Sequence, residues 1–155
     1  MNDAYLIVGS NIQPETNTHR ALRLLCSCCH VLEVSTTWET KAVGSTGPDF
    51  LDTALHIKTD FSQENLKYQV LRKIEHELGR KRSEDKNAPR TIDLDIVVFN
   101  DLVVDENLWT HAYLAIPVSE LLPDLIDPHS GVSLKQIAAM ISFNTVAIPR
   151  FRFEL

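Results

Sequence analysis

The order of strand-like and helix-like segments along the chain is the feature that most limits its fold. Four segments rich in β-branched and aromatic residues predict strands, at 4–8, 30–39, 50–59 and 91–99. Helix patterns separate them: residues 14–26 begin with a proline, and residues 63–78 carry apolar residues at every fourth position. The resulting β-α-β-β-α-β order predicts an α+β, ferredoxin-like sandwich, in which two helices pack on one face of an antiparallel sheet.

Smaller elements follow residue 99 and extend this unit at its C-terminal end. We expect a short strand near 102–104, a turn of helix after Pro117 and a helix from about Ser133 to Ile141. The chain has 155 residues, 44% of them hydrophobic, which suits one domain large enough to bury a substantial core. Because no internal repeat or linker divides the sequence, residues 1–155 are expected to form a single domain with C-terminal additions.

Charge and cysteine content argue against several broad classes of function. The net charge of −6 disfavours indiscriminate binding to nucleic acid or to an anionic membrane. No apolar run approaches the roughly 18 residues of a membrane-spanning helix, and the start of the chain lacks the basic region of a secretion signal. Three crowded cysteines, Cys26, Cys28 and Cys29, indicate a reduced, cytoplasmic chain, since no second cluster exists to pair with them. Burial explains them better than a metal site with His30, because the spacing does not fit a zinc knuckle.

Two aspartates, Asp93 and Asp95, interrupt the apolar strand segment 91–99. Side chains alternate between the two faces of a strand, so both carboxylates point to one face, away from the apolar residues between them. Two ionised and partly desolvated carboxylates repel each other unless a cation lies between them. Mg²⁺ binds one or two carboxylates and completes its coordination with water and substrate phosphate. The pair therefore predicts a magnesium site, and the alternative is a solvent-facing pair at a sheet edge.

A basic segment precedes this strand in an otherwise acidic chain. Five cations fall between positions 80 and 90, interrupted only by two acidic residues: Arg80, Lys81, Arg82, Lys86 and Arg90. Cations next to two carboxylates are the arrangement expected for a metal-bound polyphosphate, whose oxygens guanidinium groups bind in pairs. The alternative is a solvated basic loop. The sequence has neither a phosphate-binding P-loop nor a kinase glycine loop, so a nucleotide here is bound by other means.

Three sequence segments resemble one known family over residues 4–125. They are "YLIVGSN", then "STTWET" followed by "GPDFLDTAL", and "LRKIEHELGRKRSEDKNAPRTIDLDIVVF", the last of which fits the family signature without a gap. The family is the 6-hydroxymethyl-7,8-dihydropterin pyrophosphokinases of folate biosynthesis. The resemblance implies transfer of the β,γ-pyrophosphoryl group of ATP to the pterin hydroxymethyl oxygen, with release of AMP.

The resemblance also implies catalytic roles for five residues. Asp93 and Asp95 match the family aspartates that hold two Mg²⁺ ions. Arg80, Arg82 and Arg90 match loop arginines that contact phosphates and move when the site closes. Phosphoryl-type transfer depends mainly on positioning and charge neutralisation, so this set of residues suits the reaction.

Substrate contacts follow from the same resemblance. Five positions match residues that bind the pterin: Thr40, Val43, Phe50, Asp52 and Tyr113. Phe50 and Tyr113 are the two aromatics that sandwich the ring. Arg72 and Glu75 fall at nucleotide-contacting positions of the second predicted helix. The implied partners are thus ATP and the pterin, with no nucleic acid or membrane, and we expect a monomer.

The sequence departs from the family pattern at several positions that handle substrate. The loop after the metal strand is short and lacks a Pro-His pair, and His111 stands where an arginine is expected. His111 is assigned to nucleotide binding, with an ordinary polar residue before a strand as the alternative. Asp52 replaces an asparagine, Asn87 a tryptophan and Arg72 a glutamine. These changes leave open a degenerate paralogue that binds pterin or nucleotide without catalysis.

Asp52 carries a specific hypothesis about pterin binding. Phe50 and Asp52 are two apart on a predicted strand, so both side chains face the same way. An ionised carboxylate could then accept hydrogen bonds from the ring N–H and the exocyclic NH₂ of the pterin together. The alternative is that Asp52 faces the pterin carbonyl and repels it. A metal-dependent nucleic-acid-processing module is a further alternative, which the net charge and the lack of closely spaced aromatics disfavour.

Overall fold

The computed structural model describes residues 1–44, 47–80 and 90–155 of the chain. Its elements occur in the following order: β1 (Asn2–Ser10), α1 (Pro14–Cys28), β2 (His30–Val34), β3 (Thr36–Thr40), β4 (Phe50–Thr59), α2 (Gln63–Asn65), η1 (Leu66–Leu71), α3 (Arg72–Glu77), β5 (Asp93–Phe99), β6 (Leu102–Val103), η2 (Glu106–Trp109), α4 (Ala112–Leu121), α5 (Leu134–Asn144) and β7 (Ala147–Arg152). The first six strands and helices of the predicted β-α-β-β-α-β order are all present, which confirms the α+β fold class.

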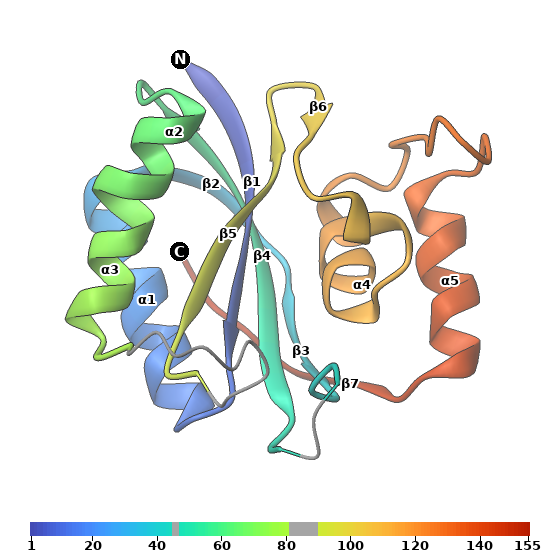
Figure 1. Cartoon of the computed structure of the whole chain (residues 1–155), viewed down its shortest axis with the longest axis horizontal. Coiled ribbons are helices and arrows are strands. Elements are labelled where there is room, and N and C mark those ends of the chain that lie inside the picture. Colours follow the sequence, from blue (N-terminus) through green and yellow to red (C-terminus); the bar gives the residue numbers. More distant parts are fainter. Residues whose placement is uncertain (45–46, 81–89) are drawn as a thin grey trace.

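Strands of the described chain form one seven-stranded sheet with the order β6-β5-β1-β4-β3-β7, and β2 pairs with β4 beside β3. Every recorded pairing is antiparallel. Helices α1, α2 and α3 cover one face of the sheet, and α4 and α5 cover the other (Figure 1). The ferredoxin-like sandwich is therefore extended by a second helical layer and by an additional edge strand.

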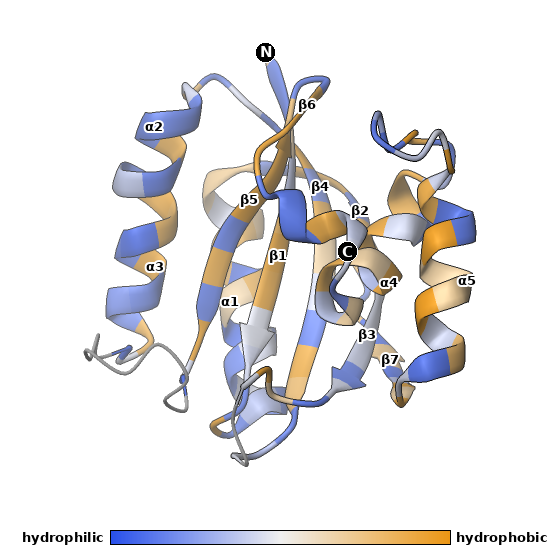
Figure 2. Cartoon of the chain, turned by 45° about the vertical axis from the view of Figure 1, so that its right-hand side comes forward, coloured by the Kyte–Doolittle hydropathy of each residue, from blue (hydrophilic) through white to orange (hydrophobic). Residues whose placement is uncertain are grey.

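The larger core lies between the sheet and the layer of α1 and α3. It takes alternate residues of the central strands, such as Leu6 and Val8 of β1 and Leu55 of β4, and packs them against helix residues such as Leu22 and Leu66. Figure 2 shows the hydrophobic side of α2 and α3 turned toward the sheet. Each fully buried aliphatic side chain contributes about 1.5–3 kcal/mol, so this layer supplies much of the stability of the fold.

The second predicted helix begins and ends where its sequence signals stand. The Ser62 Oγ accepts a hydrogen bond from the Asn65 N–H at 3.2 Å, which caps the first turn. Gly79 follows the last turn with φ of +83°, a left-handed conformation that glycine adopts without a steric penalty. The coil runs continuously through α2, η1 and α3, and its middle turn is a π-helix that the sequence pattern did not predict.

The second helical layer begins earlier than the sequence predicted. Helix α4 starts at Ala112, and Pro117 lies inside it rather than before it. A proline within a helix removes one hydrogen bond, but Leu114 and Val118 of α4 are fully buried against the sheet and offset that loss. As a consequence, Tyr113 lies on a helix, and His111 is the residue that precedes this helix rather than a strand.

Two differences concern strands. The predicted strand 30–39 is interrupted at Ser35. The Ser35 N–H donates a hydrogen bond to the Ala54 carbonyl at 2.9 Å, and the Ala54 N–H donates one to the Ser35 Oγ at 2.9 Å. The interruption separates β2 from β3, and both still pair with β4. Strand β7, which pairs with β3 at the edge of the sheet, was not predicted; it tolerates Pro149 in its middle because an edge strand is paired on one side only. Among the described residues, no helix is long and apolar enough to cross a membrane.

Candidate active site

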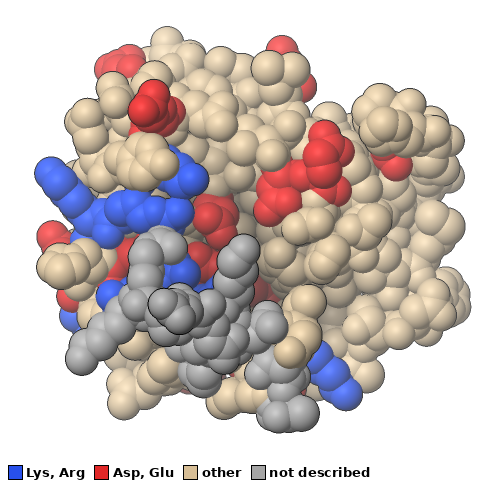
Figure 3. Space-filling view, in the orientation of Figure 1, with Lys and Arg blue, Asp and Glu red and all other residues tan. Residues whose placement is uncertain are grey.

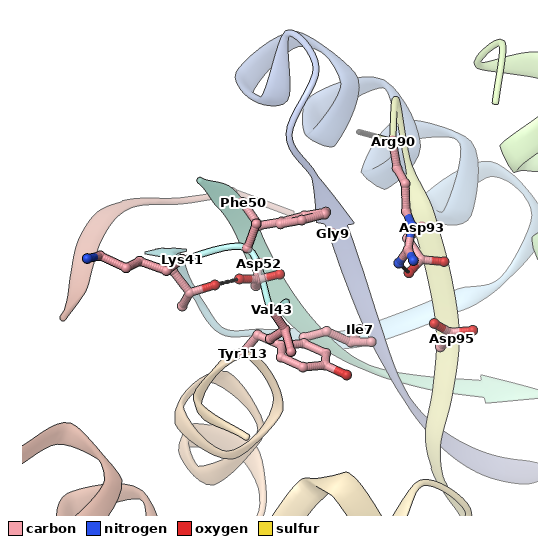
Figure 4. A pocket seen from close by; sticks show the side chains of 12 residues that line it. Ile7, Gly9, Lys41, Val43, Phe50, Asp52, Arg90, Asp93, Asp95 and Tyr113 are labelled. Carbon is pink, nitrogen blue, oxygen red and sulfur yellow. Dashed lines mark hydrogen bonds and ion pairs between the residues drawn. The ribbon is translucent and has the colours of Figure 1, made fainter. Parts of the chain in front are cut away.

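A pocket opens on the α4 face of the sheet, at the ends of β1, β4 and β5 (Figure 4). Its volume is about 590 Å³ when the part that opens to solvent is included, which falls in the ~300–1,000 Å³ range of small-molecule sites. The lining residues come from β1, the end of β3 and the loop after it, β4, β5 and α4: Ile7, Gly9, Thr40, Lys41, Ala42, Val43, Phe50, Asp52, Arg90, Asp93, Asp95 and Tyr113.

The centre of this pocket exists because β1 carries a glycine there. Gly9 pairs with Asp52 of β4 on one side and with Asp93 of β5 on the other. A Cβ atom on Gly9 would lie 3.2 Å from the Asp52 Oδ1 and 3.7 Å from the ring of Phe50. A side chain at this position would crowd Asp52 and reduce the space for a ligand between the two aspartates.

Eight of the predicted site residues line this one pocket. Five of them were assigned to the pterin: Thr40, Val43, Phe50, Asp52 and Tyr113. Three were assigned to catalysis: Arg90, Asp93 and Asp95. Phe50 and Asp52 share a face of β4 as expected, and Tyr113 approaches from α4 across the pocket (Figure 4). Residues far apart in the sequence thus form a site with aromatic walls on one side and carboxylates on the other.

Asp52 lies in an environment that differs from the one the sequence suggested. Its side chain is buried, with 2% of the residue exposed, and the Thr40 hydroxyl donates a hydrogen bond to its Oδ2. Burial raises the pKa of Asp52 to about 8; the Thr40 hydrogen bond opposes this shift and the charge of Asp93 adds to it. At neutral pH the side chain of the free protein is therefore mainly the neutral acid. The raised pKa favours the neutral acid over the expected ionised carboxylate, and the Thr40 hydrogen bond already engages one of the two oxygens that the hypothesis left for the pterin.

Asp93 and Asp95 lie on the same face of β5, while Leu94 between them is buried on the opposite face, as the alternation predicted. The Asp93 Oδ1 accepts a hydrogen bond from the Arg80 Nη1 at 2.6 Å, and its Oδ2 accepts one from the Arg90 Nη1 at 2.9 Å. The charge of Asp93 is thus balanced by two arginines that flank the pocket.

Asp95 differs from Asp93 in having no cation within salt-bridge distance among the described residues. Burial raises the pKa of Asp95 to about 6, the charges of Asp93 and Glu75 add to the shift, and Arg72 and Arg80 oppose it. The described residues contain no cluster of three metal-ligating side chains. A half-buried carboxylate with no described cation beside it, next to a second carboxylate, fits Mg²⁺, which needs only one or two protein carboxylates when phosphate oxygens supply the rest.

Behind the pocket, Glu75 of α3 organises the cations. Its Oε1 accepts a hydrogen bond from the Arg72 Nη1 at 2.8 Å, and its Oε2 accepts bonds from the Arg80 Nη1 at 2.7 Å and the Leu94 N–H at 2.9 Å. Glu75 is 2% exposed and does not line the pocket. It ties α3 to β5 and orients Arg80 toward Asp93. Figure 3 shows Lys and Arg side chains gathered on the α3 side of this face, beside acidic side chains.

Three positions singled out in the sequence need separate mention. Arg82 and the departure at Asn87 lie outside the described residues. His111 lines a neighbouring cavity between the loop after β3, the start of α4 and the end of α5, rather than the pocket itself. Its Nδ1 lies 2.8 Å from the Thr110 hydroxyl, and its ring meets the edge of the Tyr113 ring at a centroid distance of 5.7 Å.

Sequence reasoning missed some lining residues. Ile7, Gly9, Lys41 and Ala42 contribute to the pocket and were not singled out as site residues. The first strand was predicted to end at residue 8, whereas β1 continues through Gly9 to Ser10. A glycine inside a strand often marks the close approach of a ligand or another chain, but the predicted boundary placed Gly9 outside the strand. Ile7, Lys41 and Ala42 carry no comparable signal, because only the pairing of β1 with β4 and the path of the loop after β3 bring them to the pocket.

Comparison with known proteins identifies the family. The sequence profile of 7,8-dihydro-6-hydroxymethylpterin-pyrophosphokinase (HPPK) matches residues 5–123. The chain is 35% identical over 132 residues to a 2-amino-4-hydroxy-6-hydroxymethyldihydropteridine pyrophosphokinase of Bacillus subtilis, covering 77% of this chain and 78% of that protein. It is 27% identical over 150 residues to the enzyme of the same name from Synechocystis, covering 90% and 76%.

The fold agrees with a solved structure as well. A crystal structure of Plasmodium falciparum HPPK-DHPS superposes with a TM-score of 0.68 at 11% identity and covers 91% of this chain. The chain spans 44% of that longer protein, and at this identity the likeness concerns the fold alone. The profile match over most of the chain carries the assignment. This chain belongs to the 7,8-dihydro-6-hydroxymethylpterin-pyrophosphokinase family.

Proposed function

We propose that this chain is an active pyrophosphokinase of folate biosynthesis, which transfers the terminal pyrophosphoryl group of ATP to the hydroxymethyl oxygen of 6-hydroxymethyl-7,8-dihydropterin and releases AMP. One observation carries the proposal: the pocket with aromatic walls opens directly onto the Asp93–Asp95 pair and its flanking arginines. Asp95 is half-buried with no described cation beside it, an arrangement that reduces stability in the free protein, so its presence supports a metal-binding site rather than a degenerate paralogue.

The pterin occupies the part of the pocket between Phe50 and Tyr113 in this proposal. Offset stacking on aromatic rings adds about 0.5–1.5 kcal/mol beyond the burial of apolar area. Asp52 and Thr40 lie at the edge of this space and already share a hydrogen bond. The neutral Asp52 side chain provides both a donor and an acceptor, as the family asparagine does, so the replacement preserves the hydrogen-bonding capacity of the position.

Asp93 and Asp95 are the residues that would hold Mg²⁺, in line with the family's two-ion site. When bound, Mg²⁺ supplies charge neutralisation and ordering of the phosphate oxygens. The side chains of this protein prepare the site in two ways. Asp95 offers a carboxylate that no described cation occupies, and Asp93 offers one that Arg80 and Arg90 hold in place.

Arg80 and Arg90 are the proposed phosphate contacts. Guanidinium groups bind phosphate oxygens in pairs and retain their charge at any physiological pH. The hydroxymethyl oxygen forms a bond to the β-phosphorus while the bond to the bridging oxygen of AMP breaks, and the hydroxyl proton is released. Most of the catalytic effect in such a transfer comes from alignment and charge stabilisation, which is what two arginines beside a carboxylate pair provide.

The remaining assignments concern the nucleotide. We keep Arg72 as a nucleotide contact, because its guanidinium is a quarter exposed beside the carboxylate side of the site. Glu75 acts through Arg72 and Arg80 rather than by touching ATP, since it is buried behind them. His111 is proposed to reach the nucleotide from the start of α4. We further propose a monomer that works in the cytoplasm, where ATP is abundant and free thiols such as Cys26 stay reduced.

A single assay tests the proposal. The purified protein is incubated with ATP, Mg²⁺ and 6-hydroxymethyl-7,8-dihydropterin, and the nucleotide product is identified by chromatography. We expect AMP in amounts equal to the pyrophosphorylated pterin, and none when either the pterin or Mg²⁺ is omitted. Binding of the pterin without any AMP would favour the non-catalytic paralogue, and ADP as the product would exclude pyrophosphoryl transfer.

A further inference from the structure

Tyr113 carries a hydroxyl group that stacking on a pterin does not need. Its side chain lines the pocket from the first turn of α4. In Figure 4 the hydroxyl end of Tyr113 points toward β5, on the side of the pocket where Asp95 lies. A phenylalanine at this position would present the same ring face without the polar atom, so the hydroxyl calls for a separate explanation.

The orientation of the ring is set by its neighbours on α4. The His111 ring meets it edge-on, with an interplanar angle of 83° and a centroid distance of 5.7 Å. The helix itself is anchored at this point, since the N–H groups of Leu114 and Ala115 both bond the His111 carbonyl, at 3.1 and 2.9 Å. The Tyr113 hydroxyl is therefore held at a defined place between the aromatic part of the pocket and the carboxylate pair.

Four carboxylates, from β4, β5 and the loop before η2, act on this hydroxyl electrostatically. After burial, which is the largest cause, the charges of Asp105, Asp95, Asp93 and Asp52 raise the pKa of Tyr113 to about 12. The group therefore keeps its proton at neutral pH. The structure records no hydrogen bond from it to any described residue. In the free protein this donor is open to solvent in the pocket, and a ligand that displaces the water there would have to supply the acceptor.

The acceptor must lie where the two substrates meet. On one side of the hydroxyl is the ring that stacks on the pterin, and on the other are the carboxylates proposed to hold metal and phosphate. We infer that the Tyr113 hydroxyl donates a hydrogen bond to a phosphoryl oxygen of the group being transferred, so that Tyr113 is a catalytic residue as well as a wall of the pterin site. This inference rests on the proposed pyrophosphokinase activity.

A donor aimed at developing charge acts mainly in the transition state, and its loss appears in kcat rather than in substrate binding. We therefore expect Tyr113→Phe to reduce kcat about 10- to 100-fold, somewhat less than loss of a fully buried oxyanion donor. The Kd for the pterin, measured by titration calorimetry, is expected to stay within about twofold because the stacking ring remains. The melting temperature reports whether the fold is intact.

Tyr5→Phe is the matched control. Tyr5 lies on β1 on the same face of the sheet, stacked on His56 at 4.4 Å and outside the pocket. Its loss of one hydroxyl should leave kcat and pterin binding unchanged. The two variants differ only in where the hydroxyl is removed.

Three results would overturn the inference while leaving the pyrophosphokinase activity in place. An unchanged kcat in Tyr113→Phe is the first. The second is weaker pterin binding at unchanged kcat, which would assign the hydroxyl to the pterin ring. The third is a parallel loss of kcat and pterin affinity, which would indicate a displaced ring. A parent protein that forms no AMP would instead overturn the proposed function, and the inference with it.

Discussion

One face of the sheet carries polar side chains at both of its ends, and the two ends differ in how their carboxyl groups are paired with cations. Along β1 and β4 the paired residues on this face are Gly9 with Asp52 at the active site, Ile7 with Ala54 under α4, and Asp3 with Lys58 at the far end. The far end also contains His56, whose Nε2 lies 2.7 Å from the Asp3 Oδ1 and whose ring stacks on Tyr5. The same two strands thus hold an active site and a surface charge cluster.

At the far end, opposite charges and hydrogen-bonding groups match one another. The Lys58 Nζ lies 3.2 Å from the Asp3 Oδ2, and the pKa of Asp3 is lowered, chiefly by its hydrogen bond with His56. At the site, burial raises the pKa of Asp52 and Asp95. Burial penalises the ionised form of Asp52 and of Asp95 in the free protein, whereas Asp3 already has its partners in place. Perturbed carboxyl groups of this kind favour a ligand-binding role for the end that holds Asp52 and Asp95.

The largest expected effect comes from applying one substitution at each end. Asp95→Asn should abolish pyrophosphoryl transfer, a greater loss than the roughly 10–100-fold caused by altering the outer partners of a metal ligand. The metal-free variant should melt at a slightly higher temperature, because a half-buried charge with no described cation beside it is removed. AMP formation and thermal unfolding measure the two effects.

Asp3→Asn is the control for this experiment. It removes a carboxylate that His56 and Lys58 contact, so the melting temperature should fall while AMP formation continues at the parent rate. Near-normal turnover in Asp95→Asn would remove the reason for placing a metal there. Equal changes of melting temperature in the two variants would show that the carboxylates at the two ends do not differ in their effect on stability.

Arg90→Ala tests the cations that flank the site. Arg90 contacts the Asp93 Oδ2 at 2.9 Å, and we expect its loss to lower kcat and kcat/KM together by about 10- to 100-fold. Pterin binding without nucleotide should change little. Arg150→Ala, which removes a guanidinium 4.0 Å from Glu39 on the edge strand, should leave turnover unchanged. A variant of Arg90 whose only defect is a raised KM for the pterin contradicts the phosphate role.

Asp52→Asn tests the unmatched carboxyl through the pH dependence of stability. The pKa of Asp52 rises from 3.8 to about 8 on folding, so between these values the folded protein binds the extra proton. Stability contributed by this proton is therefore lost as pH rises from about 4 to 8, by about 1.4 kcal/mol per pH unit. Asparagine does not titrate, so the free energy of unfolding of the variant should not change in this way. The difference in stability between the variant and the parent should therefore grow up to pH 8 and stay constant above it. Urea unfolding at several pH values measures this margin, which must depend on pH if Asp52 is its source.

The same variant addresses pterin binding. If the neutral acid binds the ring, the affinity of the parent falls as pH rises through about 8, and Asp52→Asn retains its affinity there. Thr40, Asp93 and Tyr113 line the pocket with Asp52 from β3, β5 and α4, and the lining cations are Lys41 and Arg90. Calorimetric titration of the pterin between pH 6 and 9 gives the answer. An affinity that increases with pH would restore the ionised carboxylate as the binding form.

The smallest expected effect belongs to Lys58→Met at the far end. The Lys58–Asp3 pair is partly exposed, and such surface pairs contribute roughly 0–1 kcal/mol. AMP formation should be unchanged, and any loss of stability should shrink further at high salt because the pair is screened. A change in turnover would show that the two ends of the face are coupled through α4.

Where a single local signal was sufficient, the sequence predicted the elements that hold the site. Alternation at Asp93, Leu94 and Asp95 predicted which residues face the pocket, and Ser62 with Gly79 marked the ends of the second helix. Pro117 misled the prediction of α4, because the burial of its neighbours overrides the proline signal. Strand β7 escaped detection because its place beside β3 depends on a pairing with residues more than 100 positions earlier.

The sequence by itself determined the succession of strands and helices, the facing of the two aspartates and the family to which the chain belongs. Only the tertiary structure decided how the charges are distributed: Arg80 and Arg90 bind Asp93, Asp95 is left without a described cation, and Glu75 lies behind the pocket. The physical reason is that alternation and helix periodicity act over a few neighbouring residues. Desolvation and ion pairing depend instead on which distant segments meet, as when α3 packs on β5 or Thr40 reaches Asp52 across two strands.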